Sequence, residues 1–254
     1  VHEANPNIVP LVVLEDWVKK LSGTTLSFMK ITFFGHACFM IETMGKLLLF
    51  DPFITPNALA SNVNVDSIKP DYIILSHGHE DHVADVELIY KNSDATIISN
   101  YEVINWFGSK GLDRGHPMNP GGKWQFDFGS LKMVNAIHSS SMPDGSYGGV
   151  PVGIIISNQE STFYYSGDTA LTKDMELIGE EFDLSFAIMP IGDNFTMGIS
   201  DAIKACEMVK TDKLIGVHFD TFPYVKIDHE SAKKTASDKN ITLFIPEIEQ
   251  EISL

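Results

Sequence analysis

Ser76-His77-Gly78-His79-Glu80-Asp81-His82 places three imidazoles and two carboxylates within six residues, directly after the apolar run Tyr72-Ile73-Ile74-Leu75. The run is typical of a buried strand. If the backbone stays extended, His77 and His79 point the same way, because strand side chains alternate. The Asp and His that end the motif then lie on the first turn of a helix. Histidine and carboxylate are common ligands of zinc, manganese and iron, so the spacing predicts two adjacent metal ions. A solvated histidine-rich loop is the weaker alternative.

Predicted strands and helices alternate on both sides of this motif. Helices are expected at 81–92 and 200–210. Strands are expected at 31–42, 46–50, 71–76, 95–99, 123–128, 131–136, 152–157, 162–166, 184–189, 214–217 and 241–245, the last of these being the final strand.

One order of elements occurs twice along the chain. A hairpin ends in an acid, Asp51 or Asp168, and is followed by a buried strand that leads to His77 or Asp193. A helix and another strand come next in both halves. Two similar βα halves that face each other predict the α/β (α+β) class and a four-layer αββα sandwich of two mixed sheets.

Composition limits the partners of the chain. Asp plus Glu number 34 and Lys plus Arg 18, which gives a formal net charge of −16, and Arg114 is the single arginine. Nucleic-acid affinity depends on Lys and Arg, so we expect a small-molecule substrate and no nucleic-acid partner. Apolar runs are far shorter than the roughly 20 residues that cross a bilayer, so no membrane partner is expected. Two cysteines and the lack of a signal-peptide pattern indicate a cytoplasmic protein, and a homo-oligomer is compatible with this composition.

Residues 1–28 stand apart from the rest of the chain. They precede Met29-Lys30-Ile31, which resembles a natural protein start, and they contain apolar residues at roughly helical spacing. We therefore divide the chain into an N-terminal extension, 1–28, and one large domain, 29–254. The extension is predicted to be either a docking helix or an ordinary terminal helix packed on the surface.

The histidine motif at 77–82 resembles in full the His-x-His-x-Asp-His motif of the metallo-β-lactamase superfamily. The resemblance covers residues 31 to about 245 and implies a metallo-β-lactamase fold and a hydrolase domain at 29–254. Within the superfamily the chain is most similar to uncharacterised bacterial and archaeal metal-dependent hydrolases, the ascorbate-6-phosphate lactonase-like branch. That similarity lies in Phe34-Gly35-His36-Ala37-Cys38, Phe50-Asp51-Pro52-Phe53, Met118-Asn119-Pro120-Gly121-Gly122, His138-Ser139-Ser140-Ser141, Pro190-Ile191-Gly192-Asp193-Asn194-Phe195-Thr196-Met197-Gly198 and His218-Phe219-Asp220-Thr221-Phe222-Pro223.

The resemblance implies a set of seven ligands, each near the end of a predicted strand. One metal ion would be held by His77, His79 and His138, the second by Asp81, His82 and His218, and Asp168 would bridge the two. Three differences from other branches of the superfamily narrow the assignment of this chain. β-Lactamases of the main class have a Cys at the position of Asp168, and flavodiiron oxygen reductases have an acid at the position of His79. The 50 residues from Asp168 to His218 leave no room for the inserted domain of the RNA- and DNA-cleaving branch.

The implied activity is hydrolysis by a metal-bridging hydroxide, which two divalent ions make available near neutral pH. The ions are expected to be zinc, with manganese, iron or nickel as alternatives. The expected substrate is a small ester, lactone or phosphoester. Asp81 is the candidate for moving a proton beside the nucleophile. The alternatives are a small-nucleotide phosphodiesterase and a non-catalytic metal-binding scaffold or sensor. Any phosphate would have to be bound by the metals, by Lys, or by amides of loops such as Gly121-Gly122 and Gly148-Gly149.

Six further residues are candidates for supporting the ligands or contacting substrate. Asp51 follows a strand and could accept a hydrogen bond from a ligand histidine, although a turn-capping role is equally compatible. His36 lies in the first predicted strand, where a packed core histidine is the alternative. The remaining four lie in polar loops beside strand ends: Ser139, Asp193, Asn194 and Thr196.

Overall fold

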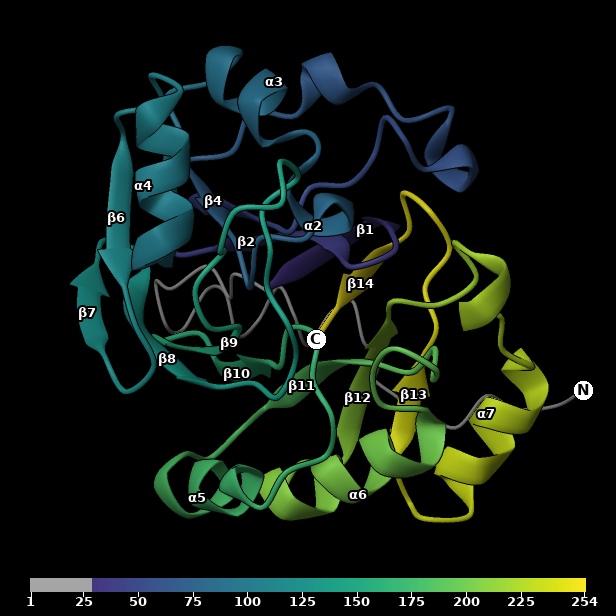
Figure 1. Ribbon diagram of the computed structural model, residues 1–254. Helices are drawn as coiled ribbons and strands as arrows, with labels where there is room; N and C mark the ends of the chain where they lie inside the picture. The colour runs from purple at the N-terminus through teal and green to yellow at the C-terminus, as the bar shows by residue number, and fades with distance from the viewer. Residues whose placement is uncertain (1–28) are drawn as a thin grey trace, which may run out of the picture.

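The computed structural model describes residues 29–254, so the predicted extension at 1–28 lies outside the described residues (Figure 1). Two seven-stranded sheets pack face to face, and helices cover the outer face of each sheet. This arrangement confirms the predicted αββα sandwich. No helix within 29–254 combines the length and the apolar character that a membrane crossing requires.

The first sheet has the strand order β14-β1-β2-β3-β4-β5-β6. Pairing is antiparallel from β14 to β3 and parallel from β3 to β6. Its strands are β1 (Lys30–Gly35), β2 (Cys38–Thr43), β3 (Lys46–Phe50), β4 (Tyr72–Ile74), β5 (Thr96–Asn100), β6 (Gly115–Met118) and β14 (Glu251–Ser253).

The second sheet repeats this pattern with the order β13-β12-β11-β10-β9-β8-β7. Strands β8 to β13 pair antiparallel, antiparallel, then three times parallel, as β1 to β6 do. The twofold order of elements is therefore confirmed. The strands are β7 (Lys123–Phe126), β8 (Gly129–Asn135), β9 (Val152–Ser157), β10 (Thr162–Tyr165), β11 (Phe186–Pro190), β12 (Lys213–Val217) and β13 (Thr242–Phe244).

Helices close both outer faces because each presents one apolar side to a sheet. On the first sheet these are α2 (Glu80–Val83), α3 (Val86–Lys91) and α4 (Tyr101–Ser109), and on the second α5 (Asp174–Glu181), α6 (Ile199–Val209) and α7 (His229–Ser237). In α6 the residues Ala202, Cys206 and Val209 recur at helical spacing and are fully buried. The sequence pattern thus sets which side of the helix packs on the sheet.

Aromatic side chains fill the space between the two sheets. Phe50 from the first sheet packs against Phe163 and Tyr165 from the second, with ring centroids 6.4 and 5.6 Å apart. All three rings are fully buried. Burial of each such side chain contributes about 1.5–3 kcal/mol, so this core holds the two halves together beneath the site.

Three local predictions are wrong. The expected strand at 31–42 is two strands, because Gly35 and His36 adopt positive φ angles of 101° and 54° and turn the chain back. The expected helix at 81–92 breaks at Asp85, whose backbone N–H donates to the carbonyl of Pro52 instead of continuing the helix. The strand predicted as the last, at 241–245, is followed by β14, a three-residue strand too short to give a clear pattern.

Candidate metal centre

The seven predicted ligands lie together where strands from both sheets end. Two follow β4, two lie in α2, and one follows each of β8, β10 and β12: His77, His79, Asp81, His82, His138, Asp168 and His218. The carboxyl ends of parallel strands are the usual place for binding sites in sheets with helical crossovers. Segments far apart in the sequence are thus brought to one edge of the sandwich.

Three imidazoles form the first group, His77, His79 and His138, whose ligand nitrogens all lie within 4.8 Å of one another. His77 Nε2 is 2.9 Å from His79 Nδ1. Burial lowers the pKa of all three side chains. They are therefore neutral at pH 7, and each has a lone pair available to a cation.

The second group contains the acid of the motif. Asp81 Oδ2 lies 3.9 Å from His82 Nε2 and 3.8 Å from His218 Nε2. Burial opposes ionisation of Asp81, but its charged and hydrogen-bonded neighbours His82, His218 and His36 hold its pKa well below the usual range. Asp81 is thus a carboxylate at any ordinary pH.

Asp168 lies between the two groups. Its Oδ2 is 3.3 Å from His82 Nε2, 3.5 Å from His138 Nε2 and 3.1 Å from His218 Nε2. One carboxylate oxygen therefore approaches imidazoles from both groups. This is the position that a bridging ligand would occupy.

The electrostatics of the cluster suit a cation. Burial opposes protonation of His218, but Asp168 raises its pKa to about 9. Burial also opposes protonation of His82, and Asp168 and Asp81 raise the pKa of that side chain well above its usual value. His82 Nε2 is fully buried without a hydrogen-bond partner in the described chain. Buried polar atoms normally have a partner. Divalent metal ions at this position would satisfy that nitrogen and displace the protons, so the residues fit the predicted metals.

Asp51 forms hydrogen bonds with side chains of the predicted ligand motif and of the strands beside it. Its fully buried Oδ2 accepts hydrogen bonds from His82 Nδ1 at 2.8 Å and from Tyr165 OH at 2.6 Å. The same oxygen accepts from Ser76 Oγ, whose other neighbour is His77 Nδ1 at 2.9 Å. A carboxylate that accepts from Nδ1 fixes the His82 ring with Nε2 directed to the site, where a metal ion would take the place of the Nε2 proton.

His36 links the motif to the segment after β12. Its Nε2 is 3.0 Å from Asp81 Oδ2, and its Nδ1 is 3.0 Å from Thr221 Oγ1. The carbonyl of His36 also accepts the N–H of His218 at 2.7 Å. His36 is buried and close enough to Asp81, His82 and His218 to be a fourth member of that group. His36 therefore contacts the predicted ligands, which a histidine packed only in the apolar core would not do.

The four loop candidates have different surroundings. Ser139 Oγ is 3.3 Å from His79 Nε2 and borders the site. Asp193 and Asn194 form an exposed turn with φ angles of 62° and 56°, and Thr196 follows in the same turn. None of these three is among the residues that line the cavity over the cluster, whereas their neighbour Phe195 is.

A cavity of about 510 Å³ opens over the cluster. Its polar side consists of Ser139 and five of the seven predicted ligands, all except the fully buried His77 and His82. Its apolar side consists of Phe195, Phe222, Pro223 and Tyr224. No role in the site is predicted from the sequence for these four residues. The available signal was the presence of large aromatic residues in otherwise polar loops directly after β11 and β12.

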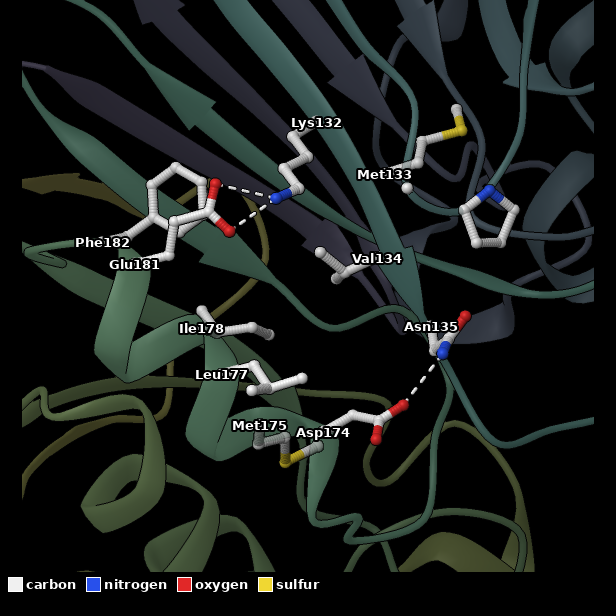
Figure 2. Close-up of a pocket in the computed structure, with 12 residues that line it drawn as sticks. Lys132, Met133, Val134, Asn135, Asp174, Met175, Leu177, Ile178, Glu181 and Phe182 are labelled. Atoms are coloured by element: carbon white, nitrogen blue, oxygen red, sulfur yellow. Dashed lines mark hydrogen bonds and ion pairs between the residues drawn. The ribbon is translucent and has the colours of Figure 1, made fainter.

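A second cavity of about 320 Å³ lies between β8 and α5, away from the predicted ligands (Figure 2). Lys132 Nζ contacts Glu181 at 2.6 Å on one side, and Asn135 Nδ2 donates to Asp174 Oδ2 at 2.8 Å on the other. These pairs satisfy the polar groups of the cavity, and no predicted ligand lines it. It is not the hydrolytic site.

Comparisons with known proteins agree with this geometry. Residues 47–219 match the family model described as the beta-lactamase superfamily domain. A UPF0173 metal-dependent hydrolase of Flavobacterium johnsoniae is 51% identical over 226 residues, 89% of this chain and 100% of the relative. The relative YtkL of Bacillus subtilis, of the same description, is 42% identical over 80% of this chain and 91% of its own. A metallo hydrolase from the archaeon Ignicoccus hospitalis superposes with a TM-score of 0.81 at 30% identity, covering 90% of this chain and 99% of that one.

Proposed function

Because the chain belongs to the UPF0173 metal-dependent hydrolases of the metallo-β-lactamase superfamily, we propose that its ligand cluster holds two divalent metal ions and hydrolyses a small ester, lactone or phosphoester. The family membership makes the protein a metal-dependent hydrolase. The number of ions and the substrate class are the proposed part. The similarity to an ascorbate-6-phosphate lactonase stays a prediction.

The observation that carries the proposal is the position of Asp168. Its Oδ2 lies within 3.5 Å of His138 in the first group and of His82 and His218 in the second. A single ion would need only one of the two groups. An acid that approaches both groups is well placed to bridge two ions, and this favours a two-ion centre over a single site.

The ions, once bound, supply an activated water and polarise the group that it attacks. The chain's own residues do the rest. Asp81 borders the cavity with 28% of its side chain exposed, so its carboxylate can exchange a proton with a substrate. His36 holds that carboxylate through Nε2, and Asp51 holds the His82 ring through Nδ1.

The donor set favours zinc. Imidazole is a borderline ligand that suits zinc, iron and nickel, and carboxylate also suits manganese. Five imidazoles and two carboxylates therefore favour zinc, with manganese, iron and nickel as alternatives. Both cysteines are buried and unpaired with each other, and neither belongs to a candidate metal cluster of residues 29–254. Thiolate-selective metals such as Cu(I) are therefore disfavoured.

Metal analysis of matched variants tests the proposal. Wild type should bind about two ions per chain, and His79→Ala and His218→Ala about one each, because each removes a ligand from a different group. His116→Ala is the control, since His116 contacts Trp124 and Phe126 away from the cluster. Equal metal content in wild type and His79→Ala contradicts the assignment.

A further inference from the structure

The cavity over the ligand cluster has an apolar side that the proposed chemistry does not use. The Phe195 and Tyr224 rings meet edge to face with centroids 6.0 Å apart, and 52% and 72% of these residues are exposed. Phe222 and Pro223 continue this side toward the cluster. Rings this exposed bury little area in the folded chain and contribute little to its stability. Exposed aromatic clusters beside a site are typical of ligand contact.

The Phe195 ring stands on a fixed turn. Met197 N–H donates to the carbonyl of Thr169 at 3.0 Å, and Asp193 N–H donates to the carbonyl of Met197 at 3.1 Å. Met197 itself is buried. The turn is thus anchored beside Asp168 by contacts that do not involve the ring.

The Tyr224 ring also stands on a fixed turn, the 3-10 segment Pro223–Val225. Asp220 N–H donates to the carbonyl of Val225 at 2.8 Å, and Asp220 Oδ2 lies 2.6 Å from His229 Nε2. Val225 is fully buried. Because these contacts fix the backbone that carries both rings, a ligand would order less of the chain on binding and lose less free energy.

The same cavity offers no positive side chain. Among the described residues that line it there is no Lys or Arg, and two acids, Asp81 and Asp168, face it. The glycine loops considered for phosphate do not line this cavity. Gly121 N–H donates to Met133 O at 2.8 Å and its loop borders the second cavity, and Gly148 N–H donates to Ser140 O. A phosphoester would therefore find compensation for its charge only at the metal ions.

We infer that the centre hydrolyses uncharged carbonyl esters or lactones that carry an apolar group, and that Phe195 and Tyr224 bind that group. The inference rests on the proposed function and narrows it, against the phosphoester and nucleotide alternatives. In the reaction, the oxygen of water bonds to the acyl carbon, the acyl C–O bond breaks, and the departing alcohol oxygen takes a proton. The products are a carboxylic acid and an alcohol, or a hydroxy acid from a lactone.

Three substrates distinguish the effect of an apolar group from the effect of substrate charge. γ-Phenyl-γ-butyrolactone and γ-butyrolactone differ by one ring, and bis(4-nitrophenyl) phosphate has rings but an anionic centre. The metal-loaded wild type should prefer the phenyl lactone over the plain lactone by about tenfold or more in kcat/KM, the effect of burying part of a ring. That ratio should fall severalfold in Phe195→Ala and Tyr224→Ala, mainly through KM. Comparing ratios removes differences in intrinsic reactivity.

Trp124→Ala is the matched control, because Trp124 is 54% exposed on β7, at the opposite edge of the second sheet from β13. It should keep the wild-type ratio. Binding of the neutral fluorescent probe N-phenyl-1-naphthylamine gives a readout without turnover. The probe should bind more weakly to Phe195→Ala and Tyr224→Ala, and normally to Leu177→Ala, which changes the second cavity.

Several results would overturn the inference. The inference is contradicted if the phosphodiester is hydrolysed faster than both lactones. It is also contradicted if both ring variants keep the wild-type preference for the phenyl lactone and the wild-type affinity for the probe. In either case the protein would still be a metal-dependent hydrolase. A change of oligomeric mass in the ring variants with an unchanged ratio assigns the rings to a protein contact. Absence of metal-dependent turnover of all three compounds contradicts the proposed function, and the probe affinities then decide separately whether the rings bind apolar ligands.

Discussion

The two halves of the molecule share one order of strands, but different residues follow those strands. Histidines follow the first strand of each half, His36 after β1 and His138 after β8. Acids follow the third, Asp51 after β3 and Asp168 after β10. In the second half these residues are predicted metal ligands. In the first half they hydrogen-bond to predicted ligands instead, His36 to Asp81 and Asp51 to His82.

The fourth strand of each half shows the opposite distribution. The histidine motif at 77–82 follows β4 in the first half, whereas the turn that carries Phe195 follows β11 in the second. After this strand the first half thus supplies four of the seven predicted ligands, whereas the second half supplies part of the apolar side of the cavity. Residues that follow equivalent strands are therefore predicted ligands in one half, and in the other half they either hydrogen-bond to ligands or line the apolar side of the cavity. This assignment can be tested position by position.

Asp168→Ala should have the largest effect, because Asp168 approaches both groups. We expect the loss of most bound metal and a fall in turnover of more than about a hundredfold, since even residues that merely support ligands commonly change affinity by ten- to hundredfold. Metal content and turnover are measured together. Asp174→Ala, a change of acid at the second cavity, should retain both. A variant that keeps its full metal content removes Asp168 from the ligand set.

Asp51→Asn should have a smaller but clear effect, because Asp51 holds His82 without approaching the predicted ions. The amide leaves one of the donors on Oδ2 without an acceptor, and metal affinity should fall by about ten- to hundredfold. Titration with a competing chelator measures this fall. Tyr165→Phe is the control that removes one hydrogen bond to the same oxygen and keeps the charge. If both variants lose affinity equally, the effect comes from packing.

His36→Gln should act on turnover more than on metal content. The amide can still bond to Asp81 or to Thr221 but not replace both contacts of the ring. We expect kcat to fall by roughly tenfold with the ions retained, and the pH profile of kcat to shift, since the partner of Asp81 has changed. Loss of an ion would instead make His36 a ligand, equivalent to His138 in the other half.

Removal of residues 1–28 should have the smallest effect on chemistry. The motif and all seven predicted ligands lie in 29–254. A chain that starts at Met29 should keep its metal content and its turnover within about twofold, the range of surface changes away from a site. A shortened chain that folds and binds metal but is inactive would place part of the site in the extension.

How far the sequence predicts this molecule depends on the range of the contacts. The motif at 77–82 is local, and its six residues indicate metal chemistry without any fold. The placement of Asp168 near His82 depends on strands from different sheets, and only the repeated order and the family resemblance predicted it. The contact of His36 with Asp81 was not predicted, because the turn inside the apolar run at 31–42 is marked by a single glycine, Gly35, which a strand can also contain. The pairing of Phe195 with Tyr224 joins two loops, which no periodicity links.

Anomalous diffraction from metal-loaded crystals would locate the ions among the side chains. We expect two peaks about 2.0–2.2 Å from their ligand atoms, one at His77, His79 and His138 and one at Asp81, His82 and His218, with Asp168 reaching both. Two other groups of side chains are close enough to hold an ion, His36 with Asp81, His82 and His218, and Asp51 with His77 and His82. A single peak bound by His36 or by Asp51 would contradict the division of roles between the halves.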